Sequence, residues 1–273
     1  MSAAVKGWRW LVALGALGAP LAAGAVPYEC LIEPMQVVEL RSPVEGLIEK
    51  VNVHRGDPVK QGQVLVELDS KVERSTVELA RYRSRMKGRI AAAKDRVDYA
   101  RKKLERQAEL HVHQFVATQT RDQAETELRL AESELAEAVE NQEVAKREYQ
   151  RAVDLLEQRS LRSPFDGVVT DRLLNPGDLA ESGTGRKAVL TLAEIDPLRV
   201  EVVLPVQAYG ALKQGMVGQV HPEGFDGSYE AVVKVVDPVI DAASGTFRVS
   251  LEMPNRDGAP PSGVRCSVEF PEM

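Results

Sequence analysis

The sequence predicts an α+β chain of several modules: a small β-sandwich in two halves, a long antiparallel coiled-coil α-hairpin between the halves, and a small β-barrel after them. A repeat indicates the split, because residues 41–46 read Arg-Ser-Pro-Val-Glu-Gly and residues 162–167 read Arg-Ser-Pro-Phe-Asp-Gly. A Gly-Asp pair follows ten residues after each final glycine, at 56–57 and at 177–178, so the two copies match in phase. Heptads fill the sequence between the copies, and strand candidates follow the second copy.

The first 25 residues are predicted to be an export signal. Lys6 and Arg9 precede an apolar run over 10–21, and Ala23-Gly24-Ala25 is a small-x-small cleavage site. The apolar run is shorter than the ~20 residues that a membrane-spanning helix needs. We therefore expect cleavage after Ala25, with retention of the signal as an anchor as the alternative.

Two cysteines remain after this cleavage, near opposite ends of the mature chain. Export would place Cys30 and Cys266 in an oxidising compartment, where they can form a disulfide. Two separate thiols are the alternative. A disulfide would require both ends of the mature chain to meet in one module, because its Cα atoms lie about 4.4–6.8 Å apart.

The charge balance excludes one class of partner. The chain has 35 Lys and Arg residues against 41 Asp and Glu residues, a formal net charge of −6. A nucleic-acid-binding domain is expected to carry a basic footprint. No nucleic-acid partner is therefore expected.

Each half of the sandwich is predicted from short strands and glycine turns. In the first half, residues 46–53 partly alternate between apolar and polar, and 64–68 form a second strand candidate. The second half offers 167–170 and 188–192. Gly56 marks a turn, because glycine tolerates positive φ.

The segment between the halves is predicted to be a hairpin of two helices. In its second arm, residues recur every seven positions in two sets offset by four: Ala124, Ala131, Ala138, Ala145 and Ala152, and Leu128, Leu135, Gln142, Tyr149 and Leu156. The first arm repeats this pattern with Val72, Leu79, Met86, Ala93 and Ala100, and with Ile90, Val97 and Leu104 in the alternate register. Such 4-3 spacing is typical of a coiled-coil seam. Gly88 weakens the first arm slightly, but each arm is expected to be one unbroken helix of about 40 residues, ~60 Å long.

The hairpin is predicted to reverse near residues 113–118. Phe115 and Val116 place apolar side chains at this exposed turn. Either they cap the hairpin internally or they insert into a partner protein.

After residue 195 the pattern becomes all-β. The strand candidates are 198–204, 218–221, 229–236, 246–253 and 264–270. Gly, Pro, Asn and Asp separate them at the spacing of a small barrel or sandwich.

These features together resemble the membrane fusion proteins of bacterial efflux and secretion systems, also called periplasmic adaptor or HlyD-type proteins. In that family an α-hairpin splits a biotinyl-lipoyl-like module, and a β-barrel follows. The sequence Asp-Pro-Val-Ile-Asp at 237–241, followed by Ser-Gly-Thr at 244–246, also looks like the family's barrel. The resemblance implies a signal peptide over 1–25, a lipoyl-like module over 26–71 plus 160–195, an α-hairpin over 72–159 and a barrel over 196–273, with 26–36 also a candidate for pairing with the barrel.

The resemblance also implies a docking motif at the hairpin tip. The family often has Arg, then Leu four residues on, then Ser seven later, and this motif contacts the outer-membrane channel. Arg106 and Leu110 match, whereas Ala117 occupies the serine position with Thr118 next to it. The expected partner-binding residues are Arg106, Leu110, Phe115, Val116, Ala117 and Thr118. An ordinary solvated helix residue is the alternative for Arg106.

No catalytic, metal or cofactor site is expected. The sequence lacks a Walker-type phosphate loop and a nucleophile elbow. His111 and His113 form a His-x-His pair, but a stable zinc site usually needs three or four ligands. A lipoyl or biotin carrier would present a modifiable lysine on a tight hairpin between its halves, whereas Lys71 begins a helix here.

The expected function is that of a periplasmic adaptor and not of an enzyme. By the resemblance, it would link an inner-membrane transporter, whose class the sequence leaves open, to a TolC-like outer-membrane channel. Copies would form a ring of six, or of three dimers, in the periplasm at the inner membrane. The alternatives are a lipoyl- or biotin-type carrier subunit and an extracytoplasmic coiled-coil scaffold without a transporter.

Overall fold

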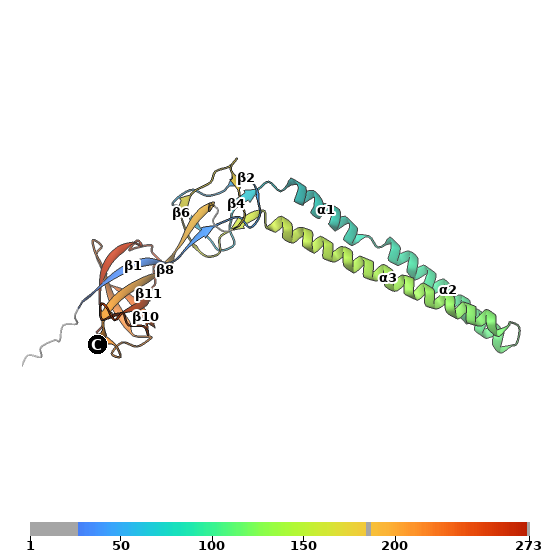
Figure 1. Ribbon diagram of the computed structural model, residues 1–273. Helices are drawn as coiled ribbons and strands as arrows, with labels where there is room; N and C mark the ends of the chain where they lie inside the picture. Colours follow the sequence, from blue (N-terminus) through green and yellow to red (C-terminus); the bar gives the residue numbers. More distant parts are fainter. Residues whose placement is uncertain (1–26, 184–186, 272–273) are drawn as a thin grey trace, which may run out of the picture. The chain divides into compact units, whose positions relative to one another are not determined.

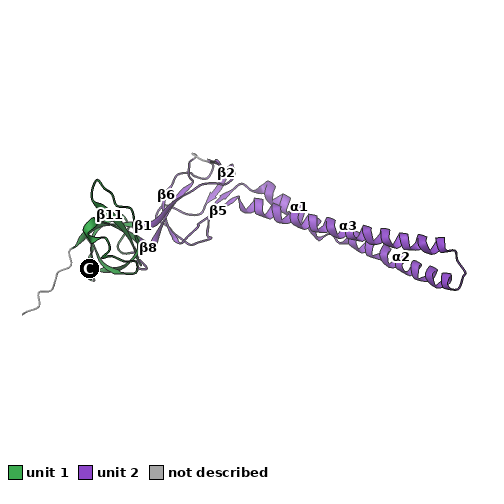
Figure 2. Ribbon diagram, turned by 60° about the horizontal axis from the view of Figure 1, so that its bottom comes forward, with its two compact units in different colours: residues 1–33, 199–254, 259–273 green, residues 34–198, 255–258 purple. Residues whose placement is uncertain are grey.

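The computed structural model describes residues 27–183 and 187–271, so the expected signal peptide and its cleavage after Ala25 lie outside the described residues. The described chain forms two compact units (Figure 2). Unit 1 contains 27–33, 199–254 and 259–271, and unit 2 contains 34–198 and 255–258. Two long strands, β1 (Tyr28–Leu40) and β8 (Leu190–Pro205), contribute residues to both units.

Unit 1 is a six-stranded β-barrel. Its strands follow the order β1, β12, β9, β10, β11, β8, and β8 pairs back with β1. The strands not yet given are β9 (Val217–Pro222), β10 (Tyr229–Val236), β11 (Thr246–Met253) and β12 (Val264–Glu269). Alternate residues point inward, and in β11 these are Phe247, Val249, Leu251 and Met253, all buried. The closed order confirms the expected barrel.

A disulfide joins the first and last strands of the barrel. Cys30 lies opposite Cys266 in the antiparallel pair of β1 with β12, and the two sulfur atoms are bonded. The cysteines are 236 residues apart, so the bond closes most of the described chain into one covalent loop. Such a cross-link stabilises a fold mainly by restricting the unfolded chain.

Unit 2 contains a β-sandwich in which the two sequence repeats pair with each other. The first repeat supplies β2 (Gly46–Val51), β3 (Pro58–Val59) and β4 (Val64–Leu68), and the second supplies β5 (Ser160–Arg162), β6 (Gly167–Arg172) and β7 (Leu179–Ala180). β2 pairs with β7, β3 with β6, and β4 with β5. The fold class expected from the repeat is therefore confirmed.

The glycine turns exchange hydrogen bonds between the halves in the same way. The N–H of Gly56 donates to the carbonyl of Val169 at 2.8 Å, and the N–H of Gly177 donates to the carbonyl of Ile48 at 2.9 Å. The glycine N–H of each turn is thus hydrogen-bonded to a backbone carbonyl of the other repeat. The in-phase spacing of the two Gly-Asp pairs follows from this symmetry.

The repeated hexapeptide plays one structural role twice. Ser42 and Ser163 are buried, and each hydroxyl donates to the backbone carbonyl two residues ahead, that of Val44 or Phe165. This local hydrogen bond closes the turn that leads into β2 or β6. The two similar hexapeptides therefore form the same backbone turn in each half.

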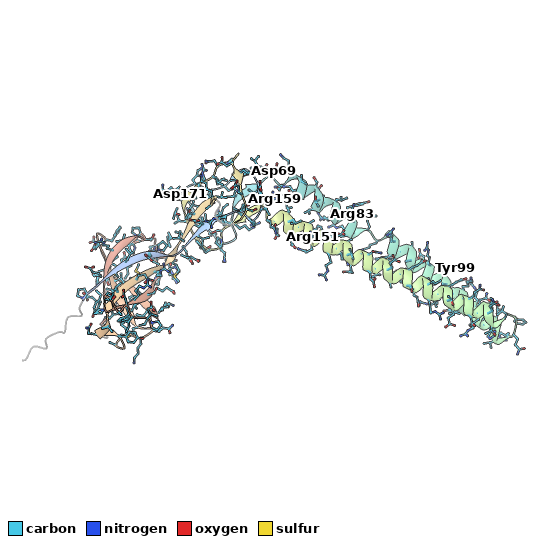
Figure 3. All side chains as sticks on the ribbon, in the orientation of Figure 1. Asp69, Arg83, Tyr99, Arg151, Arg159 and Asp171 are labelled. Atoms are coloured by element: carbon cyan, nitrogen blue, oxygen red, sulfur yellow. A yellow bond between two sulfur atoms is a disulfide. The ribbon has the colours of Figure 1, made fainter. Side chains whose placement is uncertain are left out.

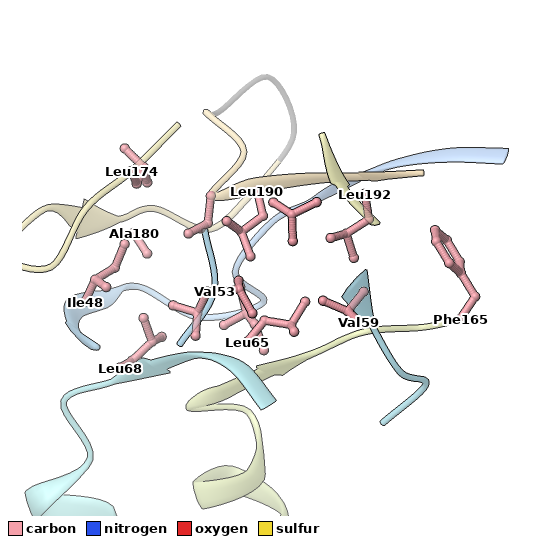
Figure 4. Close-up of a cluster of buried hydrophobic side chains, with 14 residues drawn as sticks. Ile48, Val53, Val59, Leu65, Leu68, Phe165, Leu174, Ala180, Leu190 and Leu192 are labelled. Carbon is pink, nitrogen blue, oxygen red and sulfur yellow. The ribbon is translucent and has the colours of Figure 1, made fainter. Parts of the chain in front are cut away.

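The core of the sandwich draws on both halves (Figure 4). Its fourteen buried residues are Ile48, Val53, Val59, Leu65, Val66, Leu68, Leu161, Phe165, Val169, Leu174, Ala180, Val189, Leu190 and Leu192. Gly167 lies at the edge of this core in a site with no room for a side chain. A Cβ atom there would lie 2.3 Å from the carbonyl oxygen of Ala193.

Gly167→Ala is expected to lower the free energy of unfolding by about 1–3 kcal/mol, because the β6–β8 pair must shift to admit the methyl group. Gly88→Ala is the matched control, since a Cβ at Gly88 meets nothing within 4 Å. Differential scanning calorimetry of both variants measures the difference. Equal melting temperatures for the two would show that the backbone approach at Gly167 is not tight.

Two helical arms lie side by side and antiparallel, and together they form the hairpin of unit 2 (Figure 1). The second arm is one helix, α3 (Thr118–Glu157), whereas the first is α1 (Lys71–Arg85) followed by α2 (Gly88–Val112). The seam expected in α3 is confirmed, because all ten of its residues are buried or half-buried. The α2 part of the first seam is also confirmed, since Ala93, Val97 and Ala100 are buried.

The expectation of an unbroken first arm is wrong. The helix is interrupted at Met86, whose backbone is extended with φ −69° and ψ 113°. Residues 81–89 carry a basic side chain at every second position: Arg81, Arg83, Arg85, Lys87 and Arg89. Three pairs of like charge thus lie four residues apart, which destabilises a helix. Gly88 weakens the helix further.

The break changes which face of the first arm meets α3. The seam residues expected in α1 are exposed: Val72 by 75%, Leu79 by 52% and Met86 by 59%. This part of the expectation is therefore wrong. The half-buried residues of α1 are Glu73, Val77, Ala80 and Ser84. One continuous heptad pattern thus lies on the outside in α1 and on the inside in α2.

Arg159 fastens the root of the hairpin (Figure 3). Its guanidinium donates to Glu73 Oε1 at 2.5 Å and to the carbonyl of Glu45 at 2.9 Å, and its own carbonyl accepts from the N–H of Leu68 at 2.8 Å. The side chains of Arg159 and Glu73 are only 22% and 19% exposed. One residue therefore ties the end of the second arm to the start of the first arm and to the sandwich.

Arg159→Ala is expected to lower the free energy of unfolding by about 1–3 kcal/mol, because Glu73 loses its charged partner in a half-buried site. Arg151→Ala is the control, since Arg151 is exposed and forms no ion pair with another described residue. Denaturant titration of both variants makes the comparison. A loss no greater for Arg159→Ala than for the control would contradict the assigned role.

Candidate docking site at the hairpin tip

The loop between α2 and α3 is fixed by hydrogen bonds at the end of α2. The N–H of Phe115 donates to the carbonyl of Leu110, and the N–H of Gln114 donates to the carbonyl of His111, both at 2.9 Å. Gln114 has a φ of 61°, in the left-handed region. This is the Schellman pattern of helix termination, with Gln in the position that glycine usually occupies. The loop therefore has a defined path that presents Phe115 in a fixed place.

Apolar side chains are exposed around this loop. Phe115 is 76% exposed, Val112 is 77% exposed and Leu110 is 39% exposed. Val116 is half-buried, and its carbonyl lies 3.2 Å from Nδ1 of His111. Phe115 therefore projects outward, whereas Val116 packs into the turn.

The other candidates lie at the same end of the hairpin. Arg106 is exposed and forms no ion pair with another described residue, and it precedes Leu110 by one helical turn. Ala117 and Thr118 are exposed where α3 begins. Arg106, Leu110, Ala117 and Thr118 thus lie at one end of the hairpin.

Val112 is the residue that sequence reasoning missed. It belongs to neither heptad set of the first arm, yet it is a large apolar residue at the last position of α2. An apolar residue outside the seam, next to a reversal, is the signal that could have identified it. The apolar surface at the tip is therefore larger than expected.

Ion pairs join α2 to α3 along the hairpin next to the tip. Lys103 donates to Glu127 at 2.6 Å, and Arg96 donates to Glu134 at 2.6 Å. The hydrogen bond from Lys103 to Glu127 raises the pKa of the Lys103 ammonium. These contacts hold α2 and α3 in register below the loop.

The described residues provide neither a metal site nor a lysine in the position that a lipoyl or biotin carrier needs. In the described ranges, no group of three or more His, Cys, Asp or Glu residues could hold a metal ion. Lys71, the lysine that a carrier would need near the junction, is the first residue of α1 and lies 3.8 Å from Asp69. It does not lie on a β-hairpin between the halves.

A β-sandwich split by a helical hairpin, with a β-barrel formed by the adjoining sequence, is the architecture of membrane fusion proteins. Residues 36–194 match the family described as the CzcB-like, barrel-sandwich hybrid domain. The match covers more than half of the chain. The chain therefore belongs to this family of membrane fusion proteins.

Curated relatives agree with this assignment. The multidrug resistance protein MdtE of Escherichia coli K12 is 28% identical over 238 residues, which is 82% of this chain and 58% of MdtE. The multidrug efflux pump subunit AcrA of the same strain is 24% identical over 235 residues, covering 81% of this chain and 56% of AcrA. The chain thus spans little more than half the length of these relatives.

Solved structures share the fold. MacA from Actinobacillus actinomycetemcomitans aligns with a TM-score of 0.73 at 21% identity, covering 90% of this chain and 78% of MacA. The membrane fusion protein Spr0693 from Streptococcus pneumoniae R6 aligns with a TM-score of 0.63 at 15% identity, covering 90% of this chain and 98% of that protein. Among the helices of the described residues, none is both long and apolar enough to cross a membrane.

Proposed function

We propose that this protein is the periplasmic adaptor of a tripartite efflux pump, linking an inner-membrane transporter to a TolC-like outer-membrane channel. The observation that carries the proposal is the tip, where Leu110, Val112 and Phe115 are exposed on a loop of defined path. The names of MdtE and AcrA, which are a multidrug resistance protein and an efflux pump subunit, support it.

The chain's part in such a pump is mechanical. The transporter supplies the energy for export, and the adaptor supplies length, sealing and coupling. α3 has 40 residues, which corresponds to about 60 Å of reach at ~1.5 Å per residue. Copies form a ring of six, or of three dimers, and the protein works in the periplasm at the inner membrane after cleavage of the signal behind Ala25.

The tip is proposed to bind the channel through apolar contact at its centre and charge at its side. Burying a large apolar side chain contributes about 1.5–3 kcal/mol. Phe115 and Val112, which are 76% and 77% exposed, have the most apolar surface to bury on docking, and Leu110, at 39%, adds less. Arg106, one turn behind Leu110, is placed to meet an acidic group on the channel.

Replacing both Leu110 and Phe115 with Glu is expected to weaken channel binding at least about tenfold, because the two changes together remove more than ~1.4 kcal/mol of apolar burial and add two charges. The measurement is capture of the purified cognate channel, together with restored drug tolerance in cells that lack the adaptor. Val139→Glu is the control, since Val139 is 42% exposed on α3 away from the loop.

Unchanged circular dichroism of the tip variant would exclude misfolding as the cause of any loss. Channel capture that survives both replacements would contradict the tip assignment. Intact-mass measurement separates the adaptor from the carrier alternative, because a carrier chain would bear an added lipoyl or biotin group on a lysine.

A further inference from the structure

An apolar stripe on α1 remains uncovered in the described chain. We call it the α1 outer stripe, and its residues are Val72, Ser75, Leu79 and Tyr82 of α1 together with Met86, which directly follows the helix. The four large residues are between 52% and 75% exposed. The spacing alternates between three and four residues, which is how one helix of a coiled coil presents itself to another helix. Since the opposite side of α1 packs on α3, this stripe fits a further helix.

The charges beside the stripe favour an acidic partner helix. Arg81, Arg83, Arg85, Lys87 and Arg89 form no ion pair with any other described residue. The first arm, residues 71–112, contains thirteen basic and six acidic residues, whereas α3 contains five basic and eleven acidic. The hairpin therefore has one basic arm and one acidic arm. Two copies placed side by side can pair the basic arm of one with the acidic arm of the other.

α3 carries a matching stripe on its own exposed surface. We call it the α3 outer stripe, and its residues are Leu130, Glu137, Val144, Glu148 and Leu155. The three apolar residues are 61%, 56% and 45% exposed in that order. The five residues of the stripe recur at spacings of seven and four, so they follow one side of the helix. The glutamates between these apolar residues can form ion pairs with the basic residues beside the α1 outer stripe.

The two stripes overlap in height along the hairpin. Glu73 in α1 pairs with Arg159, and the carbonyl of Met86 lies 3.5 Å from the side-chain amide of Gln142. These contacts place α1 beside the segment 142–159 of the second arm. Val144, Glu148 and Leu155 therefore lie at the heights that the α1 outer stripe occupies.

We infer that the α1 outer stripe docks on the α3 outer stripe of a second copy of this chain, with the hairpins parallel and unstaggered. Copies related by rotation about an axis along their hairpins keep equal heights, and a contact between two different surfaces can then close a ring. The overlap in height meets this condition. The inference rests on the proposed adaptor function and names the contact that would hold its ring.

Cross-linking of two single variants tests the contact directly. Purified Met86→Cys protein is mixed with purified Val144→Cys protein and treated with a short bismaleimide, to which the disulfide-bonded Cys30 and Cys266 are inert. The expected product is a dimer that contains one chain of each variant. Val139→Cys replaces Val144→Cys in the control, because Val139 is exposed but lies about 140° around α3 from Val144 at ~100° per residue.

Salt and charge exchange provide a second readout. Because the flanking charges are exposed, raising the ionic strength is expected to reduce the yield of the mixed dimer. Replacing Arg83 and Arg85 with Glu in the Met86→Cys chain is expected to reduce it at least fivefold. Replacing Glu137 and Glu148 with Arg in the Val144→Cys chain is expected to restore it. This rescue would not occur if the first change had merely damaged α1.

Two outcomes overturn the inference. One is an absence of mixed dimer at the highest soluble concentration, or an equal yield with Val139→Cys. The other is slow maleimide labelling of the Met86→Cys thiol in the monomer, which would mean that α1 turns this face toward its own α3. If the mixed dimer is absent while tip-dependent channel capture persists, the inference falls alone. If the dimer forms and no channel capture depends on the tip, the proposed function falls alone.

Discussion

The pairing of strands from one sequence repeat with strands from the other is the constraint on which the rest of unit 2 depends. Each strand of the first repeat pairs with a strand of the second: β2 with β7, β3 with β6, and β4 with β5. The sandwich therefore cannot form until residues far apart in the chain have met. β4 leads into α1 and β5 follows α3, so their pairing sets the ends of the two arms side by side. The antiparallel hairpin is a consequence of this strand pair.

The hairpin adds little hydrophobic core to what the sandwich provides. Its buried residues are mostly alanines, such as Ala124, Ala131 and Ala152 in α3. Small side chains let two helices approach closely but bury little apolar area, and the hydrophobic contribution scales with that area. The hairpin therefore depends on contacts at its root, because the exposed ion pairs between its arms contribute only about 0–1 kcal/mol each. α1 is the extreme case, because it has no buried residue at all.

Sequence reasoning succeeded where the signal was periodic or repeated. The repeat identified the split sandwich because the same turn, formed twice, needs similar residues in both copies. The heptads identified α3 because its seam is uninterrupted. It failed in α1, where the heptad residues are present but like charges four apart break the arm after Arg85. A hydrophobic pattern alone does not say which of two faces a helix will bury. At the tip, the exposure of Val112 and the left-handed Gln114 depend on how α2 ends, which no periodicity encodes.

The defect in the first arm has a physical meaning beyond local helix stability. Residues 81–89 break two rules for an isolated helix, because they crowd like charges and leave large apolar residues beside them exposed. Sequences agree with their folds at every level except where another requirement acts, and such exceptions concentrate at functional surfaces. An acidic helix from outside the chain would neutralise the arginines and cover the apolar residues at once. The features that make α1 a poor helix in one chain are therefore the same features that suit it to contact with another.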